Sequence, residues 1–109
     1  MAFSESLAAR VRDMVTRQKG IAEKKMFGSL CFLLNGNLLV GVWKDSLIVR
    51  LGPEQADRAL LKPHVKKFDV TGKPMKNWIL VEPDGVENDE QLKNWLEAAE
   101  KFVGSLPKK

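Results

Sequence analysis

The 109-residue sequence predicts a single α+β domain with two layers, an antiparallel five-stranded sheet and helices packed on it. Most of the apolar segments are separated by tight-turn residues rather than by helical segments, which is typical of strands joined as hairpins. Helical periodicity occurs near both ends of the chain, and a helix that begins at a proline is expected in the middle. The expected order of elements is therefore α-β-β-β-α-β-β-α.

The first expected element is an amphipathic helix over residues 5–18. Ser4 is a good N-cap, because its hydroxyl accepts a hydrogen bond from a backbone N–H that the first helical turn leaves free. Apolar residues then recur at helical spacing, at Leu7, Val11, Met14 and Val15. Gly20 follows and is expected to end the helix.

The middle of the chain predicts a meander of three strands. The first strand covers residues 24–34, and Asn35-Gly36-Asn37 then supplies the positive φ values of a tight hairpin turn. The second strand covers 38–43, and Lys44-Asp45 makes the next turn. The third strand alternates between two faces, with Leu47, Val49 and Leu51 on one and Ser46, Ile48 and Arg50 on the other. This alternation predicts a sheet with one solvated side.

A short helix is expected after the meander. Gly52 serves as its N-cap and Pro53 occupies the first helical position, where proline loses no hydrogen bond that the helix needs. The helix is expected to run to Leu61. Lys62-Pro63 ends it, because the residue before a proline avoids helical backbone angles.

Two further strands and a long helix complete the expected fold. The strands cover residues 65–70 and 77–82, on either side of the turn Thr71-Gly72-Lys73-Pro74. Asn88, with Gln91 three residues later, is typical of a capping box at a helix N-terminus. One apolar stripe then continues along the helix, through Leu92, Trp95, Leu96, Ala99, Phe102, Val103 and Leu106. Trp95 is expected at the centre of this stripe, in the core.

The net charge of +4 is unevenly distributed along the chain. Residues 62–81 hold five lysines and one aspartate, whereas residues 82–109 hold four basic and seven acidic residues. Cations gathered on one face are what phosphate contacts need, although an unevenly charged solvated surface would show the same composition. The candidate binding surface comprises Arg50, Lys62, Lys66, Lys67, Gly72, Lys73, Pro74, Met75 and Lys76.

Residues suited to catalysis or to metal and cofactor binding are scarce. Cys31 and His64 are the one pair that could support nucleophilic chemistry, but Cys31 lies in an apolar strand, where a free cysteine is usually a buried small hydrophobe. One cysteine and one histidine do not supply the roughly four ligands of a zinc site. The glycines are spread singly, without a phosphate-binding pattern. We therefore expect no enzyme activity, no metal and no cofactor.

The sequence also predicts the cellular compartment of the protein. No apolar stretch approaches the roughly 20 residues that span a bilayer, and the first residues lack the pattern of a secretory signal. We expect a cytoplasmic protein with no membrane partner.

Four separated motifs occur in a characteristic order: Lys25-Met26-Phe27-Gly28, Arg50-Leu51-Gly52-Pro53-Glu54, Phe68-Asp69, and Gly72-Lys73-Pro74-Met75 followed by Trp78. Together they resemble the N-terminal domain of the TfoX (Sxy) competence regulators, over residues 3–106 as one domain, with 107–109 as a frayed tail. The resemblance implies a compact two-layer α+β fold and a regulatory role without catalytic residues. The competence regulators carry a second, helical domain that is not found in this sequence, and Ser29 stands where the family often has a second glycine. Their role in competence is therefore not carried over.

The sequence thus predicts a small, non-enzymatic regulatory or adaptor module that contacts another protein through the solvated sheet face or the turn at residues 72–75. The alternative is weak, sequence-independent binding of nucleic acid through the basic segment from Lys62 to Lys76. A thiol-dependent enzyme using Cys31 is a third hypothesis. The sequence leaves open the identity of the partner and whether the protein is a monomer or a homodimer.

Overall fold

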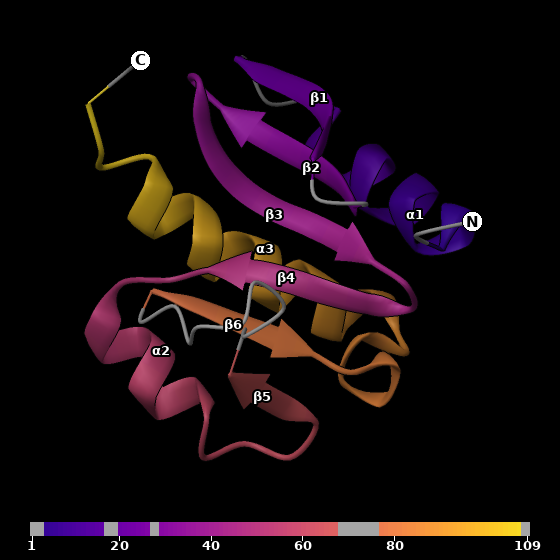
Figure 1. The fold of residues 1–109 in the computed structure, drawn as a ribbon, viewed down its shortest axis with the longest axis vertical. Helices are drawn as coiled ribbons and strands as arrows, with labels where there is room; N and C mark the ends of the chain where they lie inside the picture. Colours follow the sequence, from indigo (N-terminus) through magenta and orange to yellow (C-terminus); the bar gives the residue numbers. More distant parts are fainter. Residues whose placement is uncertain (1–3, 17–19, 27–28, 68–76, 108–109) are drawn as a thin grey trace.

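The computed structural model describes residues 4–16, 20–26, 29–67 and 77–107. Within these residues the chain forms three α-helices, six strands and one 3-10 helix. Their bounds are α1 Glu5–Val15, β1 Ile21–Met26, β2 Ser29–Leu34, β3 Asn37–Trp43, β4 Ser46–Arg50, α2 Pro53–Ala59, β5 Val65–Lys67, β6 Trp78–Val81, η1 Pro83–Val86 and α3 Asp89–Val103 (Figure 1).

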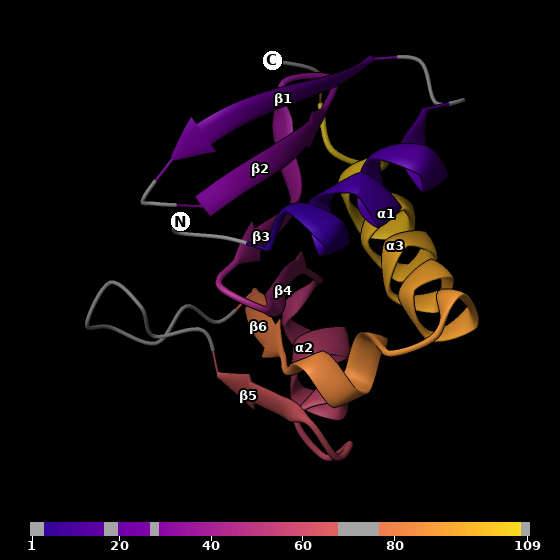
Figure 2. The ribbon, with the colours of Figure 1, turned by 90° about the vertical axis from the view of Figure 1, so that its right-hand side faces the viewer.

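The strands form one sheet in the order β1-β2-β3-β4-β6-β5, and every neighbouring pair is antiparallel. Figure 2 shows α1 and α3 on the same side of this sheet. Helix α2 contributes the buried Ala56 and Ala59 to the same core. The α+β class, the antiparallel pairing and the packing of helices on the sheet are therefore confirmed.

The expected number of strands is wrong, because the single strand predicted over residues 24–34 is two strands. The chain reverses direction between Met26 and Ser29, which are partners in the register, so that Ile21 at the start of β1 lies opposite Leu34 at the end of β2. Residues 27–28 lie outside the described residues. A single long strand at the edge of the sheet would leave many backbone N–H and C=O groups without partners. When the segment folds into a hairpin, the backbone groups along one side of each strand bond to the other strand.

The ends of three other elements also differ from the predictions. Helix α1 ends at Val15, with Thr16 as its C-cap, rather than at residue 18. Helix α2 ends at Ala59 instead of reaching Leu61. The strand predicted over 65–70 is observed as β5, Val65–Lys67, and the turn predicted at 71–74 lies outside the described residues.

The hairpin turn between β2 and β3 forms where it was predicted. Asn35 has a φ of 54° and Gly36 a φ of 83°, the two positive values that a tight hairpin of this kind needs. Asn37 already belongs to β3, and its buried side chain donates a hydrogen bond of 2.8 Å to the carbonyl of Pro107. This bond attaches the chain beyond α3 to the sheet.

The core lies between the helices and one face of the sheet. Figure 1 shows α3 running behind β3 and β4, and Figure 2 shows the helical layer beside the sheet. The side chains in the core include Val11 and Val15 of α1, Phe32, Val40, Val49 and Ile79 of the strands, and Leu92, Leu96 and Ala99 of α3. Complete burial of one such side chain stabilises the fold by roughly 1.5 to 3 kcal/mol relative to its exposure.

The opposite face of the sheet is less solvated than the alternation in β4 suggests. Cys31, Gly41, Ile48 and Leu80 form a row across β2, β3, β4 and β6, and Cys31 and Ile48 are only 3% and 4% exposed. A Cβ placed on Gly41 would lie 3.4 Å from Cys31 Sγ and 3.6 Å from Ile48 Cδ1. The two neighbouring side chains therefore close over the glycine, which explains why a cysteine on this face is buried.

Candidate functional site

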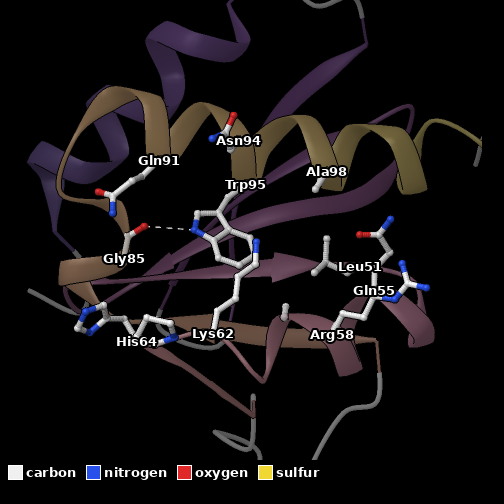
Figure 3. A pocket seen from close by; sticks show the side chains of 12 residues that line it. Leu51, Gln55, Arg58, Lys62, His64, Gly85, Gln91, Asn94, Trp95 and Ala98 are labelled. Atoms are coloured by element: carbon white, nitrogen blue, oxygen red, sulfur yellow. Dashed lines mark hydrogen bonds between the residues drawn. The ribbon is translucent and has the colours of Figure 1, made fainter.

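A surface pocket of about 460 Å³ lies between α2, α3 and η1, on the helical layer of the molecule (Figure 3). Twelve side chains line it, and they divide into an apolar floor and a polar rim. The volume falls within the range of roughly 300 to 1,000 Å³ that is usual for ligand pockets. The pocket is therefore large enough to receive a bulky side chain or a small molecule.

The floor of the pocket comes from residues that flank the buried stripe of α3. Trp95 and Ala98 are three residues apart and so lie on one face of that helix. Leu51, at the end of β4, and Ala59 of α2 are both buried beneath them. Because Ala59 and Ala98 are small, α2 and α3 leave space between them that larger side chains would fill.

The indole ring of Trp95 is held in place from two sides. Its Nε1–H donates a hydrogen bond of 3.2 Å to the carbonyl of Gly85 in η1. The Nζ atom of Lys62 lies 5.2 Å from the ring centroid, within the distance of a cation–π interaction. In Figure 3 the ring projects from α3 toward the sheet and the Lys62 chain extends up to meet it. Helix α3 belongs to the core, as predicted, but Trp95 is half-buried and packs against the core from its edge rather than lying inside it.

Gly85 is required where it accepts this hydrogen bond. A Cβ at Gly85 would lie 2.5 Å from Cγ1 of Val81 and 3.3 Å from Cβ of His64, so a larger residue would have to displace one of them. His64 itself has a φ of 65°, which is uncommon for a residue with a side chain. This corner of the pocket is therefore closely packed, and its backbone is strained at one residue.

The rim of the pocket carries cations and amides but no carboxylate. Arg58, Lys62 and His64 supply the basic groups, and Gln55, Gln91 and Asn94 supply the amides. Arg58 pairs with Glu54 at 3.1 Å, but both side chains are exposed, and such pairs contribute little. Gln91 is used in the capping box of α3. The pocket thus combines an apolar floor with a rim of positive charge.

The predicted binding surface includes several basic residues that the structure describes, and these do not lie together on one face. Lys62 lines the pocket, whereas Lys66 and Lys67 are consecutive in β5 and so belong to opposite faces of the sheet. Lys66 lies in the same row as Leu80 and forms an ion pair of 3.3 Å with Glu82. Neither lysine of β5 lines the pocket that Lys62 lines.

Arg50 is held between two aromatic rings, one on β6 and one on α3. Its Cζ lies 5.5 Å from the centroid of Trp78 and 6.0 Å from that of Phe102, and its Nη1 donates a bond of 3.4 Å to the carbonyl of Leu38. It lies next to Trp78 in the register, on the same face as Lys66. The remaining predicted site residues, Gly72, Lys73, Pro74, Met75 and Lys76, lie outside the described residues.

The pair considered for nucleophilic chemistry is not assembled. Cys31 lies in β2 and His64 immediately precedes β5, and three strands separate β2 from β5 in the sheet. Neighbouring strands are about 4.8 Å apart, so the two residues are roughly 15 to 20 Å from one another. Burial raises the pKa of the Cys31 thiol, and a hydrogen bond with Ser29 offsets this only in part. Cys31 is therefore a structural thiol at neutral pH.

Within the part of the chain that the structure describes, no group of three or more histidine, cysteine or acidic side chains is placed to hold a metal ion. No helix there has the length and apolar character needed to span a membrane.

Most of the pocket was not found from the sequence. Of its lining residues, only Lys62 belonged to the predicted binding surface. Trp95 was interpreted as part of the apolar stripe of α3, and Gln55, Asn94 and Ala98 were not singled out. The sequence contained one sign of the pocket, which is the width of the apolar stripe of α3. The stripe includes Trp95 in addition to the buried Leu92, Leu96 and Ala99, so it is wider than the set of residues that the core buries.

The chain was also compared with known proteins. No curated protein and no solved structure matches it. The family model of the TfoX N-terminal domain matches residues 13–103, which is most of the chain and includes α2, η1 and all of α3. The match therefore covers every element that lines the pocket, and the chain belongs to the TfoX N-terminal domain family.

Proposed function

We propose that this chain is a small, non-enzymatic regulatory or adaptor module of the cytoplasm that binds another protein through the pocket between α2 and α3. The observation that carries the proposal is the composition of this pocket, in which an apolar floor containing Trp95 is surrounded by exposed polar side chains. Apolar centres with polar rims are typical of protein interaction sites, and tryptophan and arginine are enriched among the residues that contribute most to binding.

Membership of the TfoX N-terminal domain family supports a regulatory role. The separation of Cys31 from His64 removes the one catalytic pair that the sequence offered. These two observations favour a module that acts by contact rather than by chemistry.

The test is site-specific photocrosslinking in cells of the native organism. A photoreactive phenylalanine analogue replaces Gln55 at the pocket rim, and in a matched control it replaces Lys93, an exposed residue of α3 that does not line the pocket. We expect a crosslinked protein from position 55 that is not formed from position 93. The same crosslink should be lost when Ala98→Phe fills the pocket, provided that thermal unfolding shows the variant to be folded.

Absence of any crosslink at position 55, or the same crosslinked proteins from both positions, would contradict the proposal.

A further inference from the structure

We infer that the pocket receives an acidic segment of the partner that inserts one large apolar side chain between α2 and α3. This inference rests on the proposed function, since it specifies the chemistry of the protein that would bind. It is drawn from three features of the pocket, which are its floor, its charge and its unused amides.

The floor selects an apolar side chain. Trp95 and Ala98 are half-buried and offer apolar surface at the bottom of the pocket, above the buried Leu51 and Ala59. Binding energy at protein interfaces is concentrated in a few large side chains that enter such pockets. One leucine, isoleucine, methionine or aromatic side chain is the group that this floor complements.

The charge of the rim selects acidic neighbours for that side chain. Arg58 lies in the last turn of α2 and Lys62 lies three residues beyond the end of that helix, and none of the twelve lining residues is acidic. The Lys62 ammonium lies over the Trp95 ring, without an ion pair to a carboxylate in the described residues. A partner carboxylate could therefore bind Lys62 without first breaking an ion pair, and complementary charge would also speed the encounter.

The amides of the rim favour a polypeptide over a small molecule. Gln55 on α2 and Asn94 on α3 are exposed, and within the described part of the chain neither side chain makes a hydrogen bond. Each amide offers both donors and an acceptor, which matches the N–H and C=O groups of a peptide backbone. Small-molecule sites instead enclose most of their ligand, whereas the rim here is largely exposed.

The experiment selects random 12-residue peptides on the intact chain by phage display and measures synthetic versions by fluorescence anisotropy. We expect the selected peptides to share one large apolar residue flanked by at least two aspartates or glutamates. Changing the apolar residue to alanine should abolish binding. The double variant Arg58→Gln, Lys62→Gln should weaken binding by about tenfold or more, because the charge-assisted hydrogen bond lost at Lys62 is by itself worth about that factor.

Matched variants distinguish the pocket from general charge. The control, Lys24→Gln with Lys93→Gln, removes the same charge from exposed positions outside the pocket and should change affinity by less than about twofold. Ala98→Phe should abolish binding by filling the pocket. Because Arg58 and Lys62 are exposed, their variants remain informative even if Ala98→Phe fails to fold.

Selected peptides that are neutral or basic, or whose affinity responds equally to the pocket and control variants, would overturn the inference. So would displacement of the peptide by a single-stranded oligonucleotide at equal concentration, which would assign the pocket to nucleic acid. A partner crosslinked at position 55, together with library peptides that lack acidic residues, would overturn the acidic segment but leave the proposed function standing. Acidic peptides that bind the pocket, with no protein crosslinked in cells, would support the inference and contradict the proposed function.

Discussion

Gly85 and Cys31 illustrate how neighbouring atoms decide what a single residue of this fold can do. The carbonyl of Gly85 orients the Trp95 ring, and the backbone approaches Val81 too closely there for any side chain. Cys31 is buried because Gly41, its partner on β3, leaves space that the thiol and Ile48 fill. In both cases a glycine sets the position of a larger neighbour.

Replacement of Gly85 by alanine is expected to destabilise the protein by about 1 to 3 kcal/mol, the usual cost of forcing an extra methyl group into a packed site. The new Cβ would lie 2.5 Å from Cγ1 of Val81, so the sheet or η1 must shift. Urea denaturation measures the loss. Pro83→Ala, at an exposed position of the same 3-10 helix, is the control and should change stability far less. Equal stability of Gly85→Ala and the native chain would contradict this packing.

The Cys31 thiol is expected to react slowly with a thiol reagent in the native state and rapidly in urea, because it is 3% exposed and its pKa is raised by burial. A raised folded pKa stabilises the native state below the thiol's unfolded value of about 8.5, and this contribution is lost as the pH rises above that value. The native chain should therefore lose stability relative to Cys31→Ala between neutral and alkaline pH. Rapid native labelling, or parallel pH profiles of the two proteins, would refute the assignment.

Helix α3 is the element whose start is best defined by local chemistry. The Asn88 side chain accepts a bond of 2.9 Å from the backbone N–H of Gln91, and the Gln91 side chain accepts one of 3.1 Å from the backbone N–H of Asn88. Both partners of this capping box are near in sequence, so the start of the helix does not depend on the rest of the fold. The packing of the helix does depend on the rest of the fold, because only one side of its apolar stripe contacts the sheet.

Asn88→Ala is expected to destabilise the protein by about 1 kcal/mol, since it leaves an N-terminal backbone N–H of α3 without its side-chain acceptor. Chemical denaturation at neutral pH measures the change. Asn94→Ala is the control because Asn94 lies within the same helix, is exposed and caps nothing, so its effect should stay within about 0.5 kcal/mol. A loss at Asn94 equal to that at Asn88 would argue against a specific cap.

The molecule as a whole has two unlike sides. One side carries α1, α3 and the pocket, and the other presents the sheet (Figure 2). The basic residues of the segment 62–67 are divided between these sides, and Lys66 is paired with Glu82. The described lysines of the segment 62–67 therefore do not form a single basic surface of the kind that follows a nucleic-acid backbone.

We expect nucleic acid to bind weakly and without sequence preference, with an affinity that falls as salt is added. Each neutralised phosphate of duplex DNA contributes a log–log slope of about −0.9. Fluorescence anisotropy at low and near-physiological salt measures this, for the native chain and for one with the lysines at 62, 66, 67, 73 and 76 changed to glutamine. Tight binding at physiological salt that prefers one sequence would instead indicate a DNA-binding regulator.

Local patterns in the sequence were sufficient to predict most elements and the family. The N-cap at Ser4, the turn at Asn35-Gly36 and the capping box at Asn88 all form as predicted, and each depends on groups within four residues of one another. The family match over residues 13–103 agrees with the resemblance seen in short motifs. The strand count failed at residues 24–34, because the sequence there contains no turn of the Asn-Gly kind to mark the reversal.

The sequence by itself determined the fold class, the family, the helix starts and the hairpin turn at Asn35-Gly36, because those depend on short-range hydrogen bonds and on apolar periodicity. Only the tertiary structure decided that Trp95 lines a pocket rather than the core, and that Lys62 and Lys66 point to different surroundings. Those outcomes depend on how α2, α3 and β5 meet across the sheet. Lys62 and Trp95, for example, are more than 30 positions apart in the sequence. Patterns of neighbouring residues do not predict a contact between residues so far apart.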